Sequence, residues 1–176
     1  EFAKGLNPQP VVIAHHPSRS AKEESVFGLT TPAELRRWND AAPNIAVGME
    51  GAPGHQAAEL RKADDRGSYP AWVYARGAYG RGFPTMGGFD QMTAIVGGFW
   101  DAMLGEGRRW WITANSDSHI HYTEGGIDFW PGEYSKTFVL AEKTHDSILE
   151  SLRAGRMFAV SGDLITALDL ALSAGM

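Results

Sequence analysis

Two short apolar runs near the start of the chain each end on residues that can bind metal ions. "PVVIA", residues 10–14, is rich in β-branched residues and leads directly into His15 and His16. "NIAVGM", residues 44–49, leads into Glu50. Short apolar runs of this length, bounded by turn residues, are typical of buried strands. The pattern therefore predicts two strands that each deliver candidate ligands at their carboxyl ends.

Two longer stretches follow helical spacing. In "TPAELRRWNDAA", Thr31 is placed as the N-cap with Pro at the next position, which predicts a helix between the two strands. Apolar residues from Met92 to Leu104 recur at offsets of three and four, and Asp90 is placed to cap them. This second pattern predicts one continuous helix, with Gly97 and Gly98 inside it.

The remaining chain alternates in the same way. We expect strands over "RRWWITA", "KTFVLAE", "MFAVSG" and "ITALDLAL", and a helix that opens at Thr144 and closes at Gly155. Residues 51–89 form a long segment rich in Gly, Pro and aromatic residues, and a loop of this length is usually functional or an insertion. Strands that alternate with helices indicate parallel βαβ units, with the site at the carboxyl ends of the strands.

The expected fold is thus α/β, with parallel strands alternating with helices in a TIM-like arrangement. Only two or three full repeats are visible, whereas a closed barrel normally needs about eight strands. We therefore interpret residues 1–176 as a single portion, the C-terminal part of such a domain. Open strand edges would invite pairing with another chain, so a homodimer formed by sheet or barrel completion is one expected state.

Composition narrows the chemistry. The formal charge of -5 and pI near 5.6 argue against general nucleic-acid binding, and no apolar stretch approaches the roughly 20 residues of a membrane span. The chain has no cysteine, so His, Asp and Glu must hold any metal ion. No signal peptide is visible, which favours a cytoplasmic location without fixing it.

Six candidate ligands follow strands: His15, His16, Glu50, Asp117, His119 and His121. Imidazole and carboxylate together suit Zn, Mn or Fe, and carboxylate-rich sites can take Mg. In extended backbone, Asp117 and His119 point the same way and could share one ion. Ordinary alternatives stay open: Asp and His also finish strands through turn chemistry, and Glu50 could be a solvated carboxylate before a Gly turn.

Two further residues are candidates for substrate contact. Arg19 follows the His-Pro turn and could pair with a phosphate oxygen, because the guanidinium fork suits that geometry. His55 lies in the long Gly-rich segment. No nucleophile elbow and no phosphate-binding P-loop is present, so nucleophilic serine chemistry and nucleotide binding of that kind are disfavoured.

Three segments resemble the polymerase and histidinol phosphatase (PHP) superfamily of metal-dependent phosphoesterases: "VVIAHHP", "ITANSDSH" and "KTFVLAEKTHDSILESLRAGRMFAVSG". The resemblance implies a distorted seven-stranded β/α barrel, two or three Zn, Mn or Fe ions, and His16, Asp117 and His119 as metal ligands. His15, Glu50 and His121 do not map securely and are candidate ligands or outer-shell residues. The early His-x-His motif of that superfamily is absent from these residues, which again suggests the C-terminal part of the domain.

The function that this resemblance implies is metal-dependent hydrolysis of a small phosphorylated substrate, a phosphate ester, by the whole protein. Whether residues 1–176 alone carry out this hydrolysis stays open. An amidohydrolase-like metal hydrolase could use the same residues. A binding module that kept the fold without catalysis is a third reading, which the Trp- and Tyr-rich stretch "YPAWVYARGAYGRGF" would suit.

Overall fold

A computed structural model of the chain describes residues 2–15, 17–18, 27–53, 89–116, 131–132, 135–161 and 165–169. Within these residues the elements follow one another as a 3-10 helix η1 (Phe2–Gly5), β1 (Val12–Ala14), α1 (Pro32–Ala41), β2 (Ala46–Pro53), α4 (Gln91–Ala94), α5 (Phe99–Gly105), β3 (Trp111–Asn115), β4 (Ser135–Val139), α6 (His145–Ala154) and β5 (Met157–Ser161). The fold is mixed α/β.

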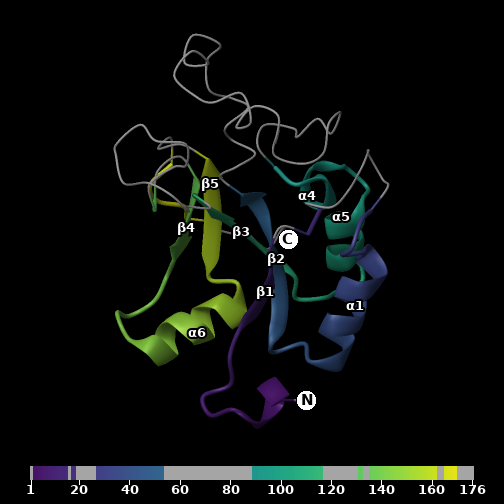
Figure 1. The fold of residues 1–176 in the computed structure, drawn as a ribbon. Coiled ribbons are helices and arrows are strands. Elements are labelled where there is room, and N and C mark those ends of the chain that lie inside the picture. Colours follow the sequence, from purple (N-terminus) through teal and green to yellow (C-terminus); the bar gives the residue numbers. More distant parts are fainter. Residues whose placement is uncertain are drawn as a thin grey trace, which may run out of the picture.

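A three-stranded parallel sheet forms the centre, in the order β1-β2-β3 (Figure 1). β4 and β5 form a second, two-stranded sheet, joined to β3 through Thr137. Its hydroxyl accepts from Ala114 N at 2.9 Å and donates to Ala114 O at 2.8 Å. The parallel pairing predicted for the first three strands is confirmed, but in the described ranges the sheet is not closed and no barrel is formed.

The prediction of parallel strands is wrong for β4 and β5, which pair antiparallel. Val139, the last residue of β4, lies opposite Met157, the first residue of β5. The chain therefore leaves β4 and enters β5 at the same end of this small sheet, and helix α6 lies within the long hairpin connection between them. A parallel crossover would carry the chain back along the strand before the next one begins. Hydrophobic periodicity carries no information about this direction.

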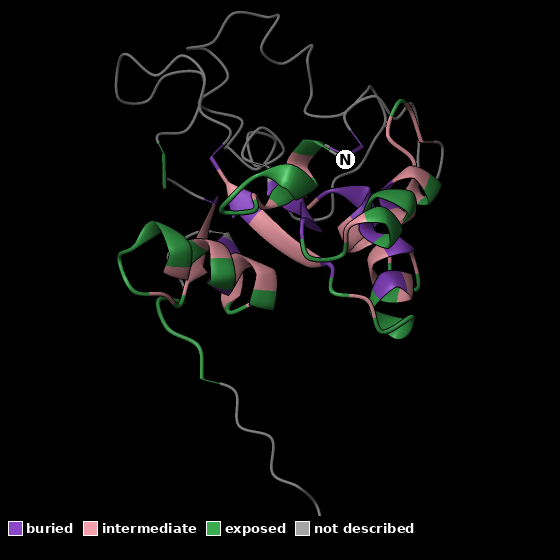
Figure 2. Cartoon of the chain, turned by 90° about the horizontal axis from the view of Figure 1, so that it is seen from below, coloured by how far each residue is buried: buried purple, intermediate pink, exposed green. Residues whose placement is uncertain are grey.

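The main core lies between the parallel sheet and the helices α1, α4 and α5, which cover one face of it (Figure 1). The buried members of this core are Ala14, Leu35, Ala46, Met49, Met92, Phe99, Met103 and Trp110. Phe99 and Trp110 pack edge to face with ring centroids 6.0 Å apart, an arrangement that aromatic quadrupoles favour. In Figure 2 the buried residues accordingly gather on the strands and on the inner side of α1.

The predicted helix from Met92 to Leu104 is broken into α4 and α5. Ile95 is extended, and Gly97 has a φ of 75°, a conformation that costs glycine little and other residues much. Asp101, in the first turn of the second helix, accepts a hydrogen bond from Gly97 N and so fixes the break against the start of that helix. The break turns Val96 outward, where it is 93% exposed instead of lying on the apolar face.

Several local predictions are confirmed. Thr31 and Thr144 cap α1 and α6 by accepting hydrogen bonds from Glu34 N and Ser147 N, and Gly155 ends α6 in the left-handed conformation. Residues 165–169 are exposed and form no strand, so the strand predicted over "ITALDLAL" is wrong there. Within the described part of the chain, no helix is long and apolar enough to cross a membrane.

Candidate functional site at the carboxyl end of the parallel sheet

Three polar side chains meet where β1, β2 and β3 end. Glu50 is only 1% exposed, so the alternative that it is a solvated carboxylate is excluded. His15 Nδ1 lies 3.0 Å from Glu50 Oε2, and Asn115 donates from Nδ2 to Glu50 Oε1. Side chains alternate along a strand, so Glu50 points away from its neighbour Met49, which packs in the helix-covered core. The carboxylate is thus held from both sides by residues of the neighbouring strands.

A second buried carboxylate, Asp90, lies at the same end of the sheet. It follows the segment 54–88 and pairs with the end of β2, donating from its backbone N to Gly51 O at 2.7 Å. Its side chain caps α4 by accepting from Met92 N at 2.8 Å. It also accepts from Ser18 Oγ at 2.7 Å and from Ser18 N at 3.1 Å.

Burial raises the pKa of Asp90 from 3.8 to about 6. The hydrogen bonds from Ser18 and Met92 N act in the opposite direction and limit the rise, and the nearby charge of Glu50 adds to it. Desolvation disfavours the ionised form, and a second carboxylate disfavours it further. This end of the sheet therefore places two buried acidic groups close enough to influence one another.

The donors present here fit a divalent metal of the predicted kind. Imidazole nitrogen and carboxylate oxygen are the ligand types of Zn, Mn and Fe sites. The 3.0 Å between His15 Nδ1 and Glu50 Oε2 is a hydrogen-bonding distance, so this contact orients the imidazole rather than placing both atoms on one ion. Among the described residues, no group of three or more metal-binding side chains gathers, so these donors would form only part of a site.

Most of the predicted site residues cannot be placed. His16, Arg19, His55, Asp117, His119 and His121 lie outside the described residues. His15 and Glu50, the two that are described, are brought together. Asp117 follows closely after β3, whose last residue Asn115 contacts Glu50.

Sequence reasoning missed three contributors to this cluster. Asn115 was visible only as part of the polar run after "WWITA", and Ser18 as part of a turn. Asp90 was predicted as a helix cap, which the structure confirms, but its contact with Ser18 spans 72 positions and leaves no local signal.

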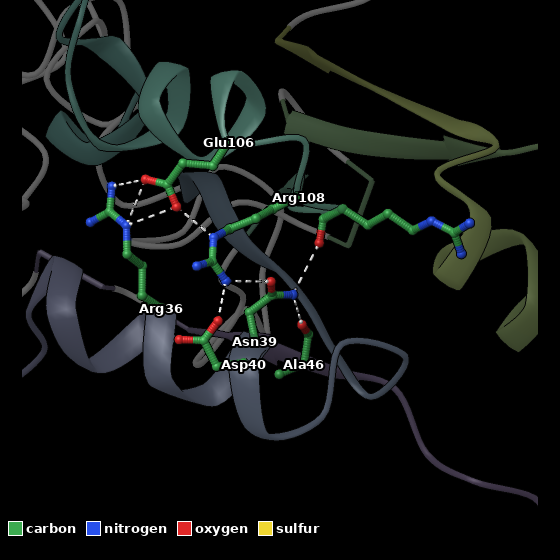
Figure 3. Close-up of polar contacts among 7 residues, drawn as sticks. Arg36, Asn39, Asp40, Ala46, Glu106 and Arg108 are labelled. Carbon is green, nitrogen blue, oxygen red and sulfur yellow. Dashed lines mark hydrogen bonds and ion pairs between the residues drawn. The ribbon is translucent and has the colours of Figure 1, made fainter.

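The opposite end of the parallel sheet holds a different charged cluster (Figure 3). Arg36 of α1 donates two hydrogen bonds to Glu106 Oε1, and Arg108 Nε lies 2.6 Å from Glu106 Oε2. Arg108 also pairs with Asp40. The Arg36 guanidinium, followed by that of Arg108, lowers the pKa of Glu106 to about 2.

Asn39 ties this exposed cluster to the sheet. It donates from Nδ2 to Ala46 O at 3.0 Å, at the start of β2, and accepts from Arg108 Nη1 at 3.2 Å (Figure 3). The cluster therefore fastens α1 to the amino ends of β2 and β3. Residues at this end of parallel α/β folds usually contribute stability rather than chemistry.

The chain matches no family model, no curated protein and no solved structure, so any functional assignment rests on its own residues.

Proposed function

We propose that this chain belongs to a metal-dependent hydrolase that cleaves phosphate esters at the carboxyl end of the parallel sheet. The observation that carries the proposal is Glu50, a carboxylate almost wholly buried and held by His15 and Asn115 at the ends of three parallel strands. Carboxyl ends of parallel strands are the usual place of active sites in α/β folds.

The electrostatics of this end support a cation. Glu50 and Asp90 are both buried near one another, and a bound cation would favour the ionised form of such carboxylates. Metal-binding histidines typically donate their second ring nitrogen to a carboxylate, which fixes the orientation of the ring. The contact between His15 Nδ1 and Glu50 has this form, so Glu50 would orient the imidazole and leave metal binding to Nε2.

Under this proposal, His16, Asp117 and His119 hold the metal ions, and His15 with Glu50 completes or supports that set. Arg19 and His55 contact the substrate, with the Arg19 guanidinium suited to a phosphate oxygen. When bound, the ions lower the pKa of a water molecule and neutralise phosphate charge. Asn115 keeps Glu50 in place by occupying its second oxygen.

The substrate class comes from the resemblance of "VVIAHHP" and "ITANSDSH" to metal-dependent phosphoesterases. An amidohydrolase-like site would use similar ligands, so assays must separate the two. The whole protein that contains this chain, loaded with Mn²⁺, Zn²⁺ or Fe²⁺, should hydrolyse p-nitrophenyl phosphate and leave simple amides and lactones intact. Hydrolysis of amides or lactones without phosphate esters would overturn the choice, and failure to retain any metal would favour a non-catalytic binding module.

A matched pair of variants tests the ligand assignment. Asp117→Ala should lower hydrolysis by about 100-fold or more, because losing a metal removes several kcal/mol of transition-state stabilisation. Asp146→Ala is the control, since Asp146 is 86% exposed on α6. If Asp117→Ala leaves both metal content and hydrolysis unchanged, the proposed function fails.

A further inference from the structure

Asp90 joins three segments that are far apart in the sequence. Through its backbone it binds the end of β2 at Gly51, and through its side chain it binds Met92 at the start of α4 and Ser18 after β1. Both Asp90 and Ser18 are fully buried. One residue thus fastens the turn that follows β1 to the end of the neighbouring strand.

The chemistry of this junction makes it rigid. Oδ1 of Asp90 accepts from Ser18 Oγ and Met92 N, while Oδ2 accepts from Ser18 N. Loosening the turn would leave buried backbone N–H groups and a buried carboxyl group without partners, which costs far more than one exposed hydrogen bond. Such fully satisfied buried networks define a single local arrangement.

We propose that Asp90 is a positioning residue that fixes, through Ser18, the turn that follows His15 against the Glu50 end of β2. The inference rests on the proposed function, because it gives this turn a task as a carrier of metal ligands. Asp90 itself contacts neither substrate nor metal. Its effect on function passes through Ser18, two positions after His16, and through Gly51, next to Glu50.

Asp90→Asn is the most direct variant. In either orientation of the new amide, its NH₂ group faces a backbone N–H, that of Ser18 or that of Met92, and that hydrogen bond is lost. The loss of a partner that orients metal ligands typically weakens metal affinity or activity by about 10- to 100-fold. Because the ligands themselves remain, raised Mn²⁺ should restore much of the lost hydrolysis.

Calorimetric titration of the chain with Mn²⁺, together with p-nitrophenyl phosphate hydrolysis at rising Mn²⁺, measures both effects. Ser18→Ala is the second variant. It removes the hydrogen bond that Ser18 Oγ donates to Asp90 and keeps the one that Ser18 N donates. Losing this single hydrogen bond should weaken Mn²⁺ binding about fivefold. Leu35→Ala is the control, because it removes buried core volume on α1 and leaves the side chains and hydrogen bonds of Asp90 and Ser18 unchanged in kind.

The expected result is weaker Mn²⁺ binding in Asp90→Asn and Ser18→Ala, recovery at high Mn²⁺, and unchanged affinity in folded Leu35→Ala. If Asp90→Asn does not fold, Ser18→Ala decides. If folded Asp90→Asn and Ser18→Ala bind Mn²⁺ as tightly as the wild type, the inference is overturned and the proposed function stands. The same holds if Leu35→Ala weakens Mn²⁺ binding as much as these two variants do. A wild-type chain that binds no Mn²⁺ would overturn the proposed function first, and the inference with it.

Discussion

The two ends of the parallel sheet differ in how their charged side chains are paired and exposed. At the amino end, positive and negative side chains alternate along a chain of ion pairs and reach water, in the order Arg36, Glu106, Arg108 and Asp40. At the carboxyl end, two carboxylates, Glu50 and Asp90, are buried almost completely. The amino-end cluster neutralises itself, pairing each carboxylate with a guanidinium (Figure 3). At the carboxyl end, within the described residues, Glu50 contacts His15 and Asn115, and Asp90 accepts hydrogen bonds from Ser18.

This difference separates two uses of charge. An exposed, balanced cluster gains little stability and is readily replaced. Buried acidic groups with perturbed pKa values cost stability and gather at functional sites more often than elsewhere. The carboxyl end is therefore the end that we expect to respond to metal ions, and the amino end is the end that we expect to respond to salt.

The largest expected effect on stability is the pH dependence that Asp90 gives to the carboxyl end of the sheet. Raising the pKa of Asp90 from 3.8 to about 6 corresponds to about 3 kcal/mol. The native state binds the extra proton, so the stability from protonated Asp90 is fully present below about pH 4 and is lost as pH rises through 6. Urea unfolding of the metal-free chain with EDTA should show this fall, and Asp90→Asn should abolish it.

The lowered pKa of Glu106 acts in a different pH window. Its stabilisation is present above its usual pKa of 4.5 and is lost as pH falls toward 2, because the guanidiniums of Arg36 and Arg108 favour the ionised form. In the same unfolding series, Glu106→Gln should remove the loss of unfolding free energy that the wild type shows below about pH 4.5. It should keep the decrease in unfolding free energy between pH 4 and 6 that comes from Asp90. An identical pH response of both variants would contradict the distinction between the two ends.

The next largest effect on stability and hydrolysis is expected when Gly51 is replaced by alanine, in comparison with the same replacement at Gly105. A Cβ on Gly51 would lie 2.8 Å from Thr93 Oγ1 on α4 and 3.0 Å from Ile112 Cβ on β3, so in Gly51→Ala the side chains packed over this part of β2 must shift. Overpacking of this kind costs about 1–3 kcal/mol and would displace Asp90, so hydrolysis should fall as well. Thermal unfolding and p-nitrophenyl phosphate assays measure the two effects.

Gly105→Ala is the matched control for that pair. Gly105 lies at the end of α5, and a methyl group at this position would have no neighbouring atom within 4 Å. Alanine should therefore be neutral or slightly stabilising through its higher helix propensity. Its hydrolysis should equal that of the wild type. A loss of activity here, equal to that of Gly51→Ala, would show that the position of α4 does not matter.

The smallest effect is expected from the amino-end cluster. Arg108→Met keeps much of the side-chain stem but removes the pairs with Asp40 and Glu106, so it should lower the melting temperature by only about 2 °C at low salt. In about 1 M NaCl, where the screening length is about 3 Å, the difference should vanish. A salt-independent loss, or a loss of hydrolysis, would contradict the assignment of this cluster to stability.

Local chemistry explains which features of the fold were predictable. Caps such as Thr31, Thr144 and Gly155 act within a few residues, so their sequence signals are complete, and β-branched runs mark the strands directly. The break at Gly97 depends on a left-handed glycine and its contact with Asp101, and the antiparallel return to β5 depends on how the chain packs. A periodic apolar pattern encodes neither feature.

The candidate site was predictable in the same partial way. Ligand types after strands predicted a site at the carboxyl end of the sheet, and two of these residues, His15 and Glu50, meet there. The contact of Asp90 with Ser18 and the link from Asn115 to Glu50 join residues 72 and 65 positions apart, so no spacing rule could reveal them. His16, Asp117 and His119 remain predictions.

Mn²⁺ binding, followed by the electron paramagnetic resonance signal of the free ion, tests the central claim most directly in the wild type, Glu50→Gln and Glu106→Gln. Both substitutions exchange one carboxylate for an amide, one at each end of the sheet. We predict binding by the wild type and by Glu106→Gln, and an affinity about 10- to 100-fold lower for Glu50→Gln. No binding by the wild type, or equal affinity in all three proteins, would contradict a metal site at the carboxyl end.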